Sequence, residues 1–531
     1  GLQLSLAARS EDSDARERAY NSLLHWKGVA ARTQSMTLAR VHQDSSAEEL
    51  ALLQEIRAQQ SLLSKLLTQS ADPANDPRLD EARRRRVEAE SRLQSMVGAR
   101  VEAQQVSWPE VHRALQPGEA LLDFVVVSPK ADPRSPVQLW LTRWDAESPE
   151  LYDLGPADEI EKEVRAFLRG LGAARGGRTL EAGGVDPARA LWKRLWQPVA
   201  GRLNDVPRIL VSPDGFLGAL PLAVLSDKKG RFLLEDHQVM RVADLSGMVH
   251  PRSRPQQAAV GLLLVGDVDY QIAAKSPESI AEDAGVERSG RQGMWPPLPA
   301  SSVEIQALEA LYRRSHADAP PPKVLRGAEA TEAAVRANAP RAAIVHLSTH
   351  GFFESGTDLD LWNMEANASG AYRPTTTTGG QALIQNFPGL ASGVVLAGAN
   401  DPHLPGPDDG LMTAEEWTWL DLSTTRLVVL SACETALGEV QAGEGMLGLP
   451  RTLHTAGAES VVSALWEVND QATADLMQDF HRRIWEEKES PVEALRSAQL
   501  RMLMQQRLRG EEPDPVLWGG FVVSTSGSWP L

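Results

Sequence analysis

Two residues able to carry out nucleophilic chemistry each follow a short apolar stretch. Cys433, the only cysteine among the 531 residues, lies near the end of RLVVLSACE (426–434), and His350 follows the apolar stretch 342–349. A thiolate is a strong nucleophile, and an imidazole within reach can take the thiol proton and later protonate a leaving group. The two residues therefore predict a nucleophile and a base. The alternative is a small, buried cysteine without a chemical role.

The stretches before these residues have the length and composition of strands buried on both faces of a parallel sheet. In such sheets the carboxyl ends of the strands meet at one edge, where catalytic groups collect. Strands are expected at 259–265, 342–348, 394–396, 427–431, 460–465 and 521–524. Helices are expected at 301–314, 329–337, 445–454, 471–487 and 491–507. This alternation predicts an α/β fold with a mostly parallel sheet covered by helices.

Six sequence blocks carry a resemblance to a known family. They are VHLSTHGFFE (345–354), SGVVLAGAN (392–400), DDGLMTAEEW (408–417), LVVLSACETALGE (427–439), GEGMLGLPRTLHTAGAESVVSALWEVND (443–470) and LWGGFVVS (517–524). In order and spacing they resemble the signature blocks of the CHAT-domain family of caspase-like cysteine peptidases, which are related to caspases and separases. The resemblance covers roughly residues 340–525, and less specific similarity reaches back to about residue 110.

The resemblance implies particular roles for residues near the two strand ends. His350 of the THG motif and Cys433 of the SACE motif would form the catalytic dyad. The backbone N–H groups of Gly351 and Cys433 would form the oxyanion hole, which stabilises the negative charge that develops during cleavage. A glycine after the histidine also lets a substrate backbone pass close by, although a plain turn glycine is the alternative.

The resemblance also implies a caspase-like active domain preceded by a catalytically silent, pseudo-caspase-like α/β domain. We predict three parts: a helical segment over 1–106, the silent α/β domain over 107–255 and the active domain over 256–531. The first part, with amphipathic helices near 47–67 and 79–103, predicts a helical hairpin against the next domain, a coiled coil or the tail of a helical-repeat array. Its basic run, Arg83 to Arg86, is expected on a solvated helix face.

The residues after the strand at 460–465 are candidates for the substrate pocket. Glu467 and Asp470 would form an acidic wall that favours Lys or Arg before the scissile bond, whereas Trp466 with Val468 would favour Leu or Met. The sequence does not decide between them. Asp470 could equally be the N-cap of the helix that follows. Two long connections, about 268–299 and 352–392, would shape the cleft.

Other motifs favour structural roles. His346 and His350 would be roughly 13 Å apart along a strand, so they cannot bind one metal ion, and His346 is expected in the core or behind the site. Gly443, Gly445 and Gly448 match G-x-G-x-x-G, but they come too long after a strand for a dinucleotide site, and we expect a loop and a helix start. Neither a metal nor a cofactor is predicted. Asp267 and Asp269 are expected to cap the end of a strand. Asp408 and Asp409 are expected to cap a helix, and an activating ion site is the alternative.

Composition limits the cellular setting and the partners. A net charge of −17 argues against nucleic acid as the main partner, since phosphate binding needs a basic surface. No apolar run approaches the roughly 18 residues of a membrane span. A single cysteine excludes an intramolecular disulfide and fits a reducing cytosol. We therefore expect a cytoplasmic protein without a membrane partner. The first residue is Gly1 rather than Met, which we interpret as a trimmed chain.

Together these features predict a cysteine endopeptidase that cleaves a specific partner protein. By resemblance, it would be a bacterial enzyme of antiviral defence or regulated cell death, activated by a partner through the N-terminal helices. One alternative is a protein-interaction scaffold with an unused caspase-like domain. Another is an acyltransferase or other thiol hydrolase that uses the same dyad.

Overall fold

The computed structural model describes most of the chain. The described residues are 12–70, 75–98, 106–127, 135–175, 187–251, 261–271, 295–353, 387–401, 404, 406–432, 435, 438–441, 445–466 and 469–527.

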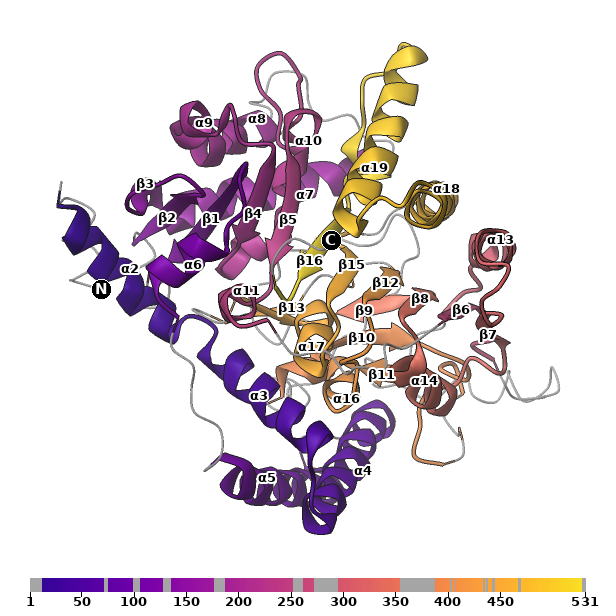
Figure 1. Ribbon diagram of the computed structural model, residues 1–531. Helices are drawn as coiled ribbons and strands as arrows, with labels where there is room; N and C mark the ends of the chain where they lie inside the picture. Colours follow the sequence, from indigo (N-terminus) through magenta and orange to yellow (C-terminus); the bar gives the residue numbers. More distant parts are fainter. Residues whose placement is uncertain are drawn as a thin grey trace.

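A large sheet forms the centre of the molecule (Figure 1). The described residues give it eleven strands in the order β3-β2-β1-β4-β5-β16-β15-β12-β8-β6-β7. Most neighbours are parallel, and the β1–β2, β2–β3 and β15–β16 pairs are antiparallel. The strands are β1 Glu119–Val126, β2 Pro136–Arg143, β3 Glu150–Pro156, β4 Arg208–Ser212, β5 Gln238–Val242, β6 Leu262–Val268, β7 Lys323–Gly327, β8 Ile344–Ser348, β12 Leu427–Ser431, β15 Ser460–Ala464 and β16 Phe521–Thr525. The predicted α/β class, a mostly parallel sheet flanked by helices, is confirmed.

Side chains alternate between two apolar layers, one on each face of the sheet. In β6, Leu262 and Leu264 pack with α13 (Pro299–Ser315), whereas Leu263 and Val265 pack in a separate cluster with α14 (Glu332–Asn338). Because the side-chain period of a strand is two residues, both faces of each strand must be apolar to be covered. The continuous apolar runs in the sequence are therefore explained by helices on both faces.

The helices divide between the two faces (Figure 1). One face of the second half of the sheet is covered by α13, α18 (Asp470–Arg482) and α19 (Pro491–Leu508), which contact one another in sequence. The other face packs with α14, α16 (Ala414–Thr418) and α17 (Leu449–Ala456). In the first half the main helices are α6 Trp108–Ala114, α7 Ala157–Arg175 and α9 Gln197–Leu203.

The sheet runs without interruption through the predicted domain boundary at 255/256. Strand β5 lies before that boundary and β16 after it, and the two pair in parallel through Ser524 with Arg241 and Thr525 with Val242. One hydrophobic core also spans the join, since it contains Trp140 as well as Phe480. The division into a silent and an active domain stays a prediction.

Two expected elements differ from the structure. The strand expected at 394–396 is β10 (Ser392–Val395), which begins two residues earlier and belongs to a separate sheet with β9 (Gly351–Phe353) and β11 (Leu411–Thr413). The helix expected from residue 445 begins only at Leu449, because β14 (Gly445–Gly448) pairs with β13 (Gly438–Gln441). Glycine is a poor helix former, and Pro450 in the first turn favours a helix start at this point.

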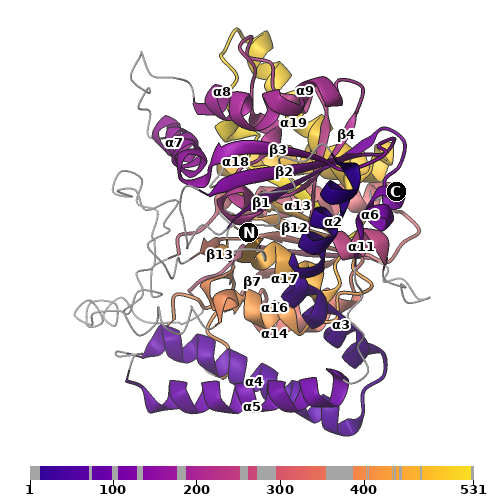
Figure 2. The same ribbon diagram turned by 90° about the vertical axis from the view of Figure 1, so that its left-hand side faces the viewer.

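The N-terminal segment is helical, as predicted, and consists of α2 Ser13–Trp26, α3 Val29–Gln43, α4 Ala47–Gln69 and α5 Pro77–Gly98. Helices α4 and α5 lie side by side (Figure 2) and form a hairpin. The hairpin packs against the C-terminal part of the chain, through Phe387, Leu390 and Trp419, whereas one prediction placed it against the segment that follows it in sequence. Helix α2 makes the contact with that segment, where Tyr20 stacks on Trp140 with ring centroids 4.8 Å apart.

The expectation of a solvated basic run holds for three of its four residues. Arg83, Arg84 and Arg85 are exposed and pair with acids one turn earlier on α5. Arg86 is buried instead, and its guanidinium lies 2.8 Å from Glu90 and 2.6 Å from Glu415 of α16. A buried charge pair of this kind joins the hairpin to the rest of the molecule. None of the described helices has both the length and the apolar character needed to cross a bilayer.

Arg86→Ala should loosen the hairpin, because it leaves two acidic side chains at the interface without their shared cation. Losing one partner of a buried ion pair typically costs about 3 to 5 kcal/mol. Hydrogen exchange of the α4 and α5 amides should accelerate accordingly. Arg84→Ala, a change to an exposed arginine on the same helix, is the matched control and should leave the exchange unchanged. Equal exchange in the two variants would contradict the role of Arg86.

Candidate active site

His350 lies two residues after the end of β8 at Ser348, at the carboxyl edge of the main sheet. Its ring is half-buried and packs beside Tyr270 and Trp295, with centroid distances of 5.2 and 5.4 Å. Nε2 is 2.7 Å from the carbonyl oxygen of Pro296. A carbonyl can only accept a hydrogen bond, so Nε2 carries the hydrogen. In the neutral ring the basic lone pair is then on Nδ1.

The residues after His350 are held by the small sheet. Gly351 is the first residue of β9 and pairs with Val394 of β10. The amide of Val395 donates a hydrogen bond of 2.9 Å to the carbonyl oxygen of His350. The backbone on both sides of the imidazole is thus fixed by strand pairing. The oxyanion-hole role of the Gly351 amide stays a prediction.

Cys433 and Glu434 lie outside the described residues, so the thiol-imidazole pair also stays a prediction. The described residues on either side of them are anchored. Strand β12 ends at Ser431, and Ala432 is buried. Thr435 is also buried; its hydroxyl donates to the carbonyl of Ala432 over 3.0 Å and accepts from the amide of Ala464 at the end of β15 over 3.3 Å.

The two strands that precede the candidate residues are paired in register. In the parallel β8–β12 ladder, Ile344 lies opposite Leu427 and Ser348 lies opposite Ser431. Both strands therefore end at the same level of the sheet. The prediction that two neighbouring strands end at one common edge is confirmed for β8 and β12.

The predicted pocket residues differ in their surroundings. Trp466 is buried in the main core, and its Nε1 donates to the carbonyl of Val516 over 3.3 Å. Glu467 lies outside the described residues, as does Val468. Asp470 is the first residue of α18, and its carboxylate accepts from the amide of Ala300 over 3.0 Å. The assignment of any of them to a substrate pocket stays a prediction.

The suggestion that Asp470 is a helix N-cap is wrong by one residue. The cap of α18 is Asn469, whose side chain accepts from the amide of Ala472 over 3.1 Å. Asp470 instead satisfies an amide in the first turn of the neighbouring helix α13, where the helix dipole favours a negative charge. The two helices are thereby joined beside the carboxyl edge of the sheet.

A buried polar cluster lies behind the strand ends. His346 is fully buried, as expected of a core histidine, and its Nε2 is 2.7 Å from the carboxylate of Glu304 on α13. Its Nδ1 is 3.1 Å from Nε2 of His481 on α18. The Glu304 carboxylate also accepts from Ser348 and Ser431, over 3.0 and 3.2 Å. Sequence reasoning missed Glu304 and His481; the available signal was a glutamate on the apolar face of α13, beside Ile305 and Leu308.

The described residues contain no cluster of three or more His, Cys, Asp or Glu side chains suited to a metal ion. Asp409, suggested as a helix cap or ion ligand, accepts from the amide of Leu411 over 2.9 Å and so stabilises a tight turn before β11. Asp408 is bound to Arg336 of α14.

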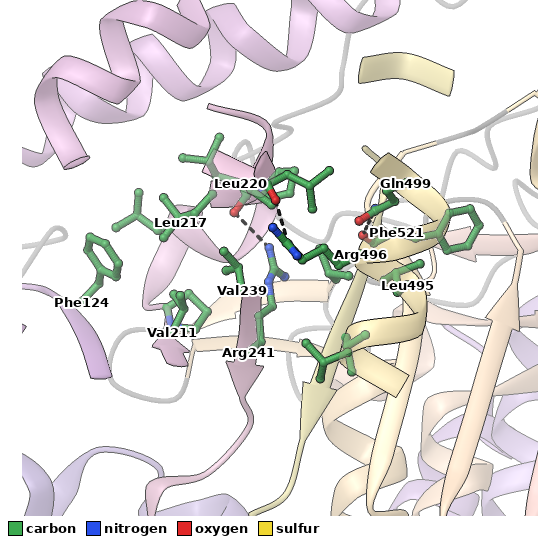
Figure 3. A pocket seen from close by; sticks show the side chains of 18 residues that line it. Phe124, Val211, Leu217, Leu220, Val239, Arg241, Leu495, Arg496, Gln499 and Phe521 are labelled. Atoms are coloured by element: carbon green, nitrogen blue, oxygen red, sulfur yellow. Dashed lines mark hydrogen bonds between the residues drawn. The ribbon is translucent and has the colours of Figure 1, made fainter. Parts of the chain in front are cut away.

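A cavity elsewhere lies over β4, β5 and β16 and beneath α19 (Figure 3). Its walls are mainly apolar, and Arg241 of β5 and Arg496 of α19 extend into the same region. Arg241 donates to the carbonyls of Gly218 and Leu220, and burial lowers its pKa to about 10. None of the residues that line this cavity belongs to the candidate site.

Acidic side chains gather where the hairpin meets the segment before β11. Glu332 of α14 accepts from the amides of Asp409 and Gly410, over 3.0 and 2.8 Å. Glu416 of α16 accepts from the hydroxyl of Ser61 on α4 over 3.0 Å. Burial, reinforced by the neighbouring Asp409, raises the pKa of Glu416 to about 7. Burial and the charge of Glu416 likewise raise the pKa of Glu332 well above its ordinary value.

Comparisons with known proteins place these features in context. The family model described as CHAT domain matches residues 185–526. The crystal structure of the Arg-specific cysteine proteinase gingipain R is similar at 8% identity and a TM-score of 0.38, over 78% of this chain and 79% of that chain. The Saccharomyces cerevisiae separase–securin complex is similar at 8% identity and a TM-score of 0.39, over 99% of this chain. The chain spans 42% of that separase chain. At TM-scores below 0.5, neither protein's substrate transfers to this chain. No curated protein matches the sequence.

The acidic cluster should make stability fall as pH rises. Glu416 has a pKa of about 7 in the folded protein and 4.5 in the unfolded chain, so its protonated form favours folding. This stabilisation is complete below about pH 4.5 and is lost as the pH rises through about 7. At about 1.4 kcal/mol per pKa unit, Glu416→Gln should remove up to about 3 kcal/mol of the decrease in unfolding free energy between pH 5 and pH 8. Urea denaturation at the two pH values measures it. Glu88→Gln, on the exposed face of α5, should retain the full decrease.

Proposed function

The chain belongs to the CHAT domain family, and from this premise we propose that it is a cysteine endopeptidase whose His350 and Cys433 form a catalytic dyad. The observation that carries the proposal is the register of β8 against β12, in which Ser348 is opposite Ser431. In the sequence, His350 and Cys433 come two residues after these paired serines. The ends of neighbouring strands are about 4.8 Å apart, and in the proposed site a proton passes between the side chains that follow them.

The state of the imidazole supports the same assignment. The Pro296 carbonyl fixes the hydrogen on Nε2, so Nδ1 is the basic nitrogen of the neutral ring. The contacts with Tyr270 and Trp295 restrict rotation of the ring. A base held in one tautomer and one orientation needs little reorganisation before it accepts a proton.

The proposed reaction has two stages. His350 takes the proton of the Cys433 thiol, and the thiolate attacks the scissile carbonyl carbon to give a tetrahedral oxyanion, bound by the N–H groups of Gly351 and Cys433. Collapse breaks the C–N bond, and the imidazolium gives its proton to the leaving amine. Water, deprotonated by His350, then attacks the thioester, releasing the carboxylic acid and restoring the thiol.

We assign the specificity of cleavage to the residues that follow β15. Glu467 would favour a basic side chain before the scissile bond, with Trp466 forming an apolar base and Asp470 adding charge. Asp470 would contribute less than Glu467 to this preference, because its carboxylate already accepts a hydrogen bond from the Ala300 amide. A Leu or Met preference remains the alternative.

A partner that binds the N-terminal helices would have a physical route to the site. The α4–α5 hairpin packs with Phe387 and Leu390, and residue 390 leads directly into β10, the strand that pairs with Gly351. This continuity supports regulated cleavage of a protein substrate. By family resemblance, the setting would be the cytoplasm of a bacterium and the purpose antiviral defence or regulated cell death.

A library of peptides bearing a cysteine-trapping warhead tests the dyad, with labelling at Cys433 read by mass spectrometry. Wild-type protein should be labelled with a side-chain preference, and His350→Ala should reduce the labelling rate by about 100-fold or more, within the usual range for loss of a general base. His25→Ala, which changes an exposed histidine on α2, should behave as wild type.

Other outcomes separate the alternatives. Labelling of equal rate without His350 would contradict the dyad. A thiol that stays unreactive even with added binding partners would favour the scaffold. Turnover of acyl thioesters without turnover of peptides would favour an acyltransferase.

A further inference from the structure

The Glu304 carboxylate connects the two strands that precede the proposed dyad. One oxygen, Oε2, accepts hydrogen bonds from Ser348 at the end of β8 and from Ser431 at the end of β12, over 3.0 and 3.2 Å. The other oxygen, Oε1, is 2.7 Å from His346. The two serines are register partners, and all four side chains are buried. One carboxylate on α13 thus fastens two neighbouring strands at the same level.

A buried polar arrangement of this kind often gives no more stability than apolar packing would. A buried carboxylate is tolerated only when hydrogen bonds replace its water, and well-packed apolar residues of similar volume are often at least as stable. On the opposite face β8 and β12 are apolar, as in Val345, Leu347, Val428 and Leu430. The two serines of the polar cluster are the last residues of β8 and β12, next to the candidate site. The polar cluster is therefore better explained by the place at which it holds the strands than by a gain in the free energy of unfolding.

Glu304 is connected through its helix and its hydrogen bonds to the segments that lead to the proposed dyad. In the sequence, His350 and Cys433 come two residues after Ser348 and Ser431, the last residues of β8 and β12. The His350 ring is bonded to the carbonyl of Pro296, three residues before α13 begins. Ser301 of α13 adds a second attachment by donating to the Ser348 carbonyl over 2.6 Å. The helix that holds the strands is thus also continuous with the segment that holds the imidazole.

A histidine pair supports the carboxylate from the opposite side. Burial and the proximity of His346 lower the pKa of His481 well below its ordinary value, so His481 is neutral. Its Nε2–H can then donate to Nδ1 of His346, whose Nε2–H donates to Glu304. This chain links α18 to α13 through β8. With three donors around it, the carboxylate has one orientation in which all of them are satisfied.

We propose that Glu304 is a positioning residue for the peptidase, holding the ends of β8 and β12 so that His350 and Cys433 meet in the reactive geometry. The proposal rests on the proposed function. Glu304 acts through Ser348 and Ser431 and touches neither member of the dyad. Because small displacements of reacting groups can lower rates by about 100-fold, a carboxylate two residues away can matter as much as a direct contact.

The pH dependence of Cys433 alkylation by iodoacetamide separates positioning from general stability. A thiol paired with an imidazolium reacts well below the ordinary cysteine pKa of about 8.5. In Glu304→Ala the inflection of the rate should move toward about 8.5, as in His350→Ala. On the best peptide from the warhead library, kcat should fall about 10- to 100-fold while KM changes less than about 3-fold. Glu304→Gln keeps one acceptor oxygen and should restore part of kcat.

Glu309→Gln is the matched control, because Glu309 lies on the same helix and pairs near the surface with Arg313 and Arg326. It should retain the wild-type profile. A folded Glu304→Ala with wild-type kcat and wild-type alkylation would overturn the positioning role and leave the dyad intact. A His350→Ala protein with the wild-type alkylation profile would instead overturn the proposed function.

If Glu304→Ala does not fold, Ser348→Ala and Ser431→Ala decide the question. Each removes one hydrogen bond to the carboxylate and leaves the carboxylate with its remaining donors. Each should lower kcat about 3- to 10-fold, in line with loss of one buried hydrogen bond of about 1 kcal/mol. Wild-type kcat in both serine variants would overturn the proposal.

Discussion

The register of β8 against β12 is the constraint on which the rest of the site depends. Alternate residues of β12 belong to different cores, with Val429 toward α18 and Val428 toward α17. A slip of one residue would exchange these faces and bring apolar side chains onto a carboxylate. It would also separate Ser431 from Ser348. The apolar pattern therefore sets the register, and the register sets which polar side chains meet at the carboxyl edge.

Buried acidic groups serve the molecule in two contrasting ways. The carboxylate of Glu304 has a hydrogen-bond partner at each oxygen. Glu332 and Glu416 lie close to each other and to Asp409, so burial and repulsion both raise their pKa values. In the first arrangement three side chains hold the carboxylate in place. The second responds to pH, and it lies where the N-terminal hairpin meets the C-terminal part of the chain.

The two halves of the sheet behave structurally as one body. The CHAT match begins at residue 185, before β4, so it includes strands on both sides of the β5–β16 pairing. That pairing is short, and the contacts around it are supplied by α19, whose Arg496 donates to the carbonyls of Leu234, Glu235 and His237. The helix at the end of the chain thus braces the segment that leads into β5. The residues matched by the CHAT model therefore lie on both sides of the β5–β16 pairing, which α19 helps to hold together.

The sequence by itself was enough to predict most of the buried strands, the covering helices, the common edge at which β8 and β12 end, and the CHAT family. These features depend on local composition, since a strand covered on both faces must be continuously apolar. Only the tertiary structure could identify Glu304, His481 and Arg86 as buried partners, because each pairs with residues far away in the chain. The same holds for Asp470, which looked like a cap of its own helix but binds a neighbouring one. Periodicity reveals which face of an element is covered, whereas the identity of the covering group depends on how the elements pack.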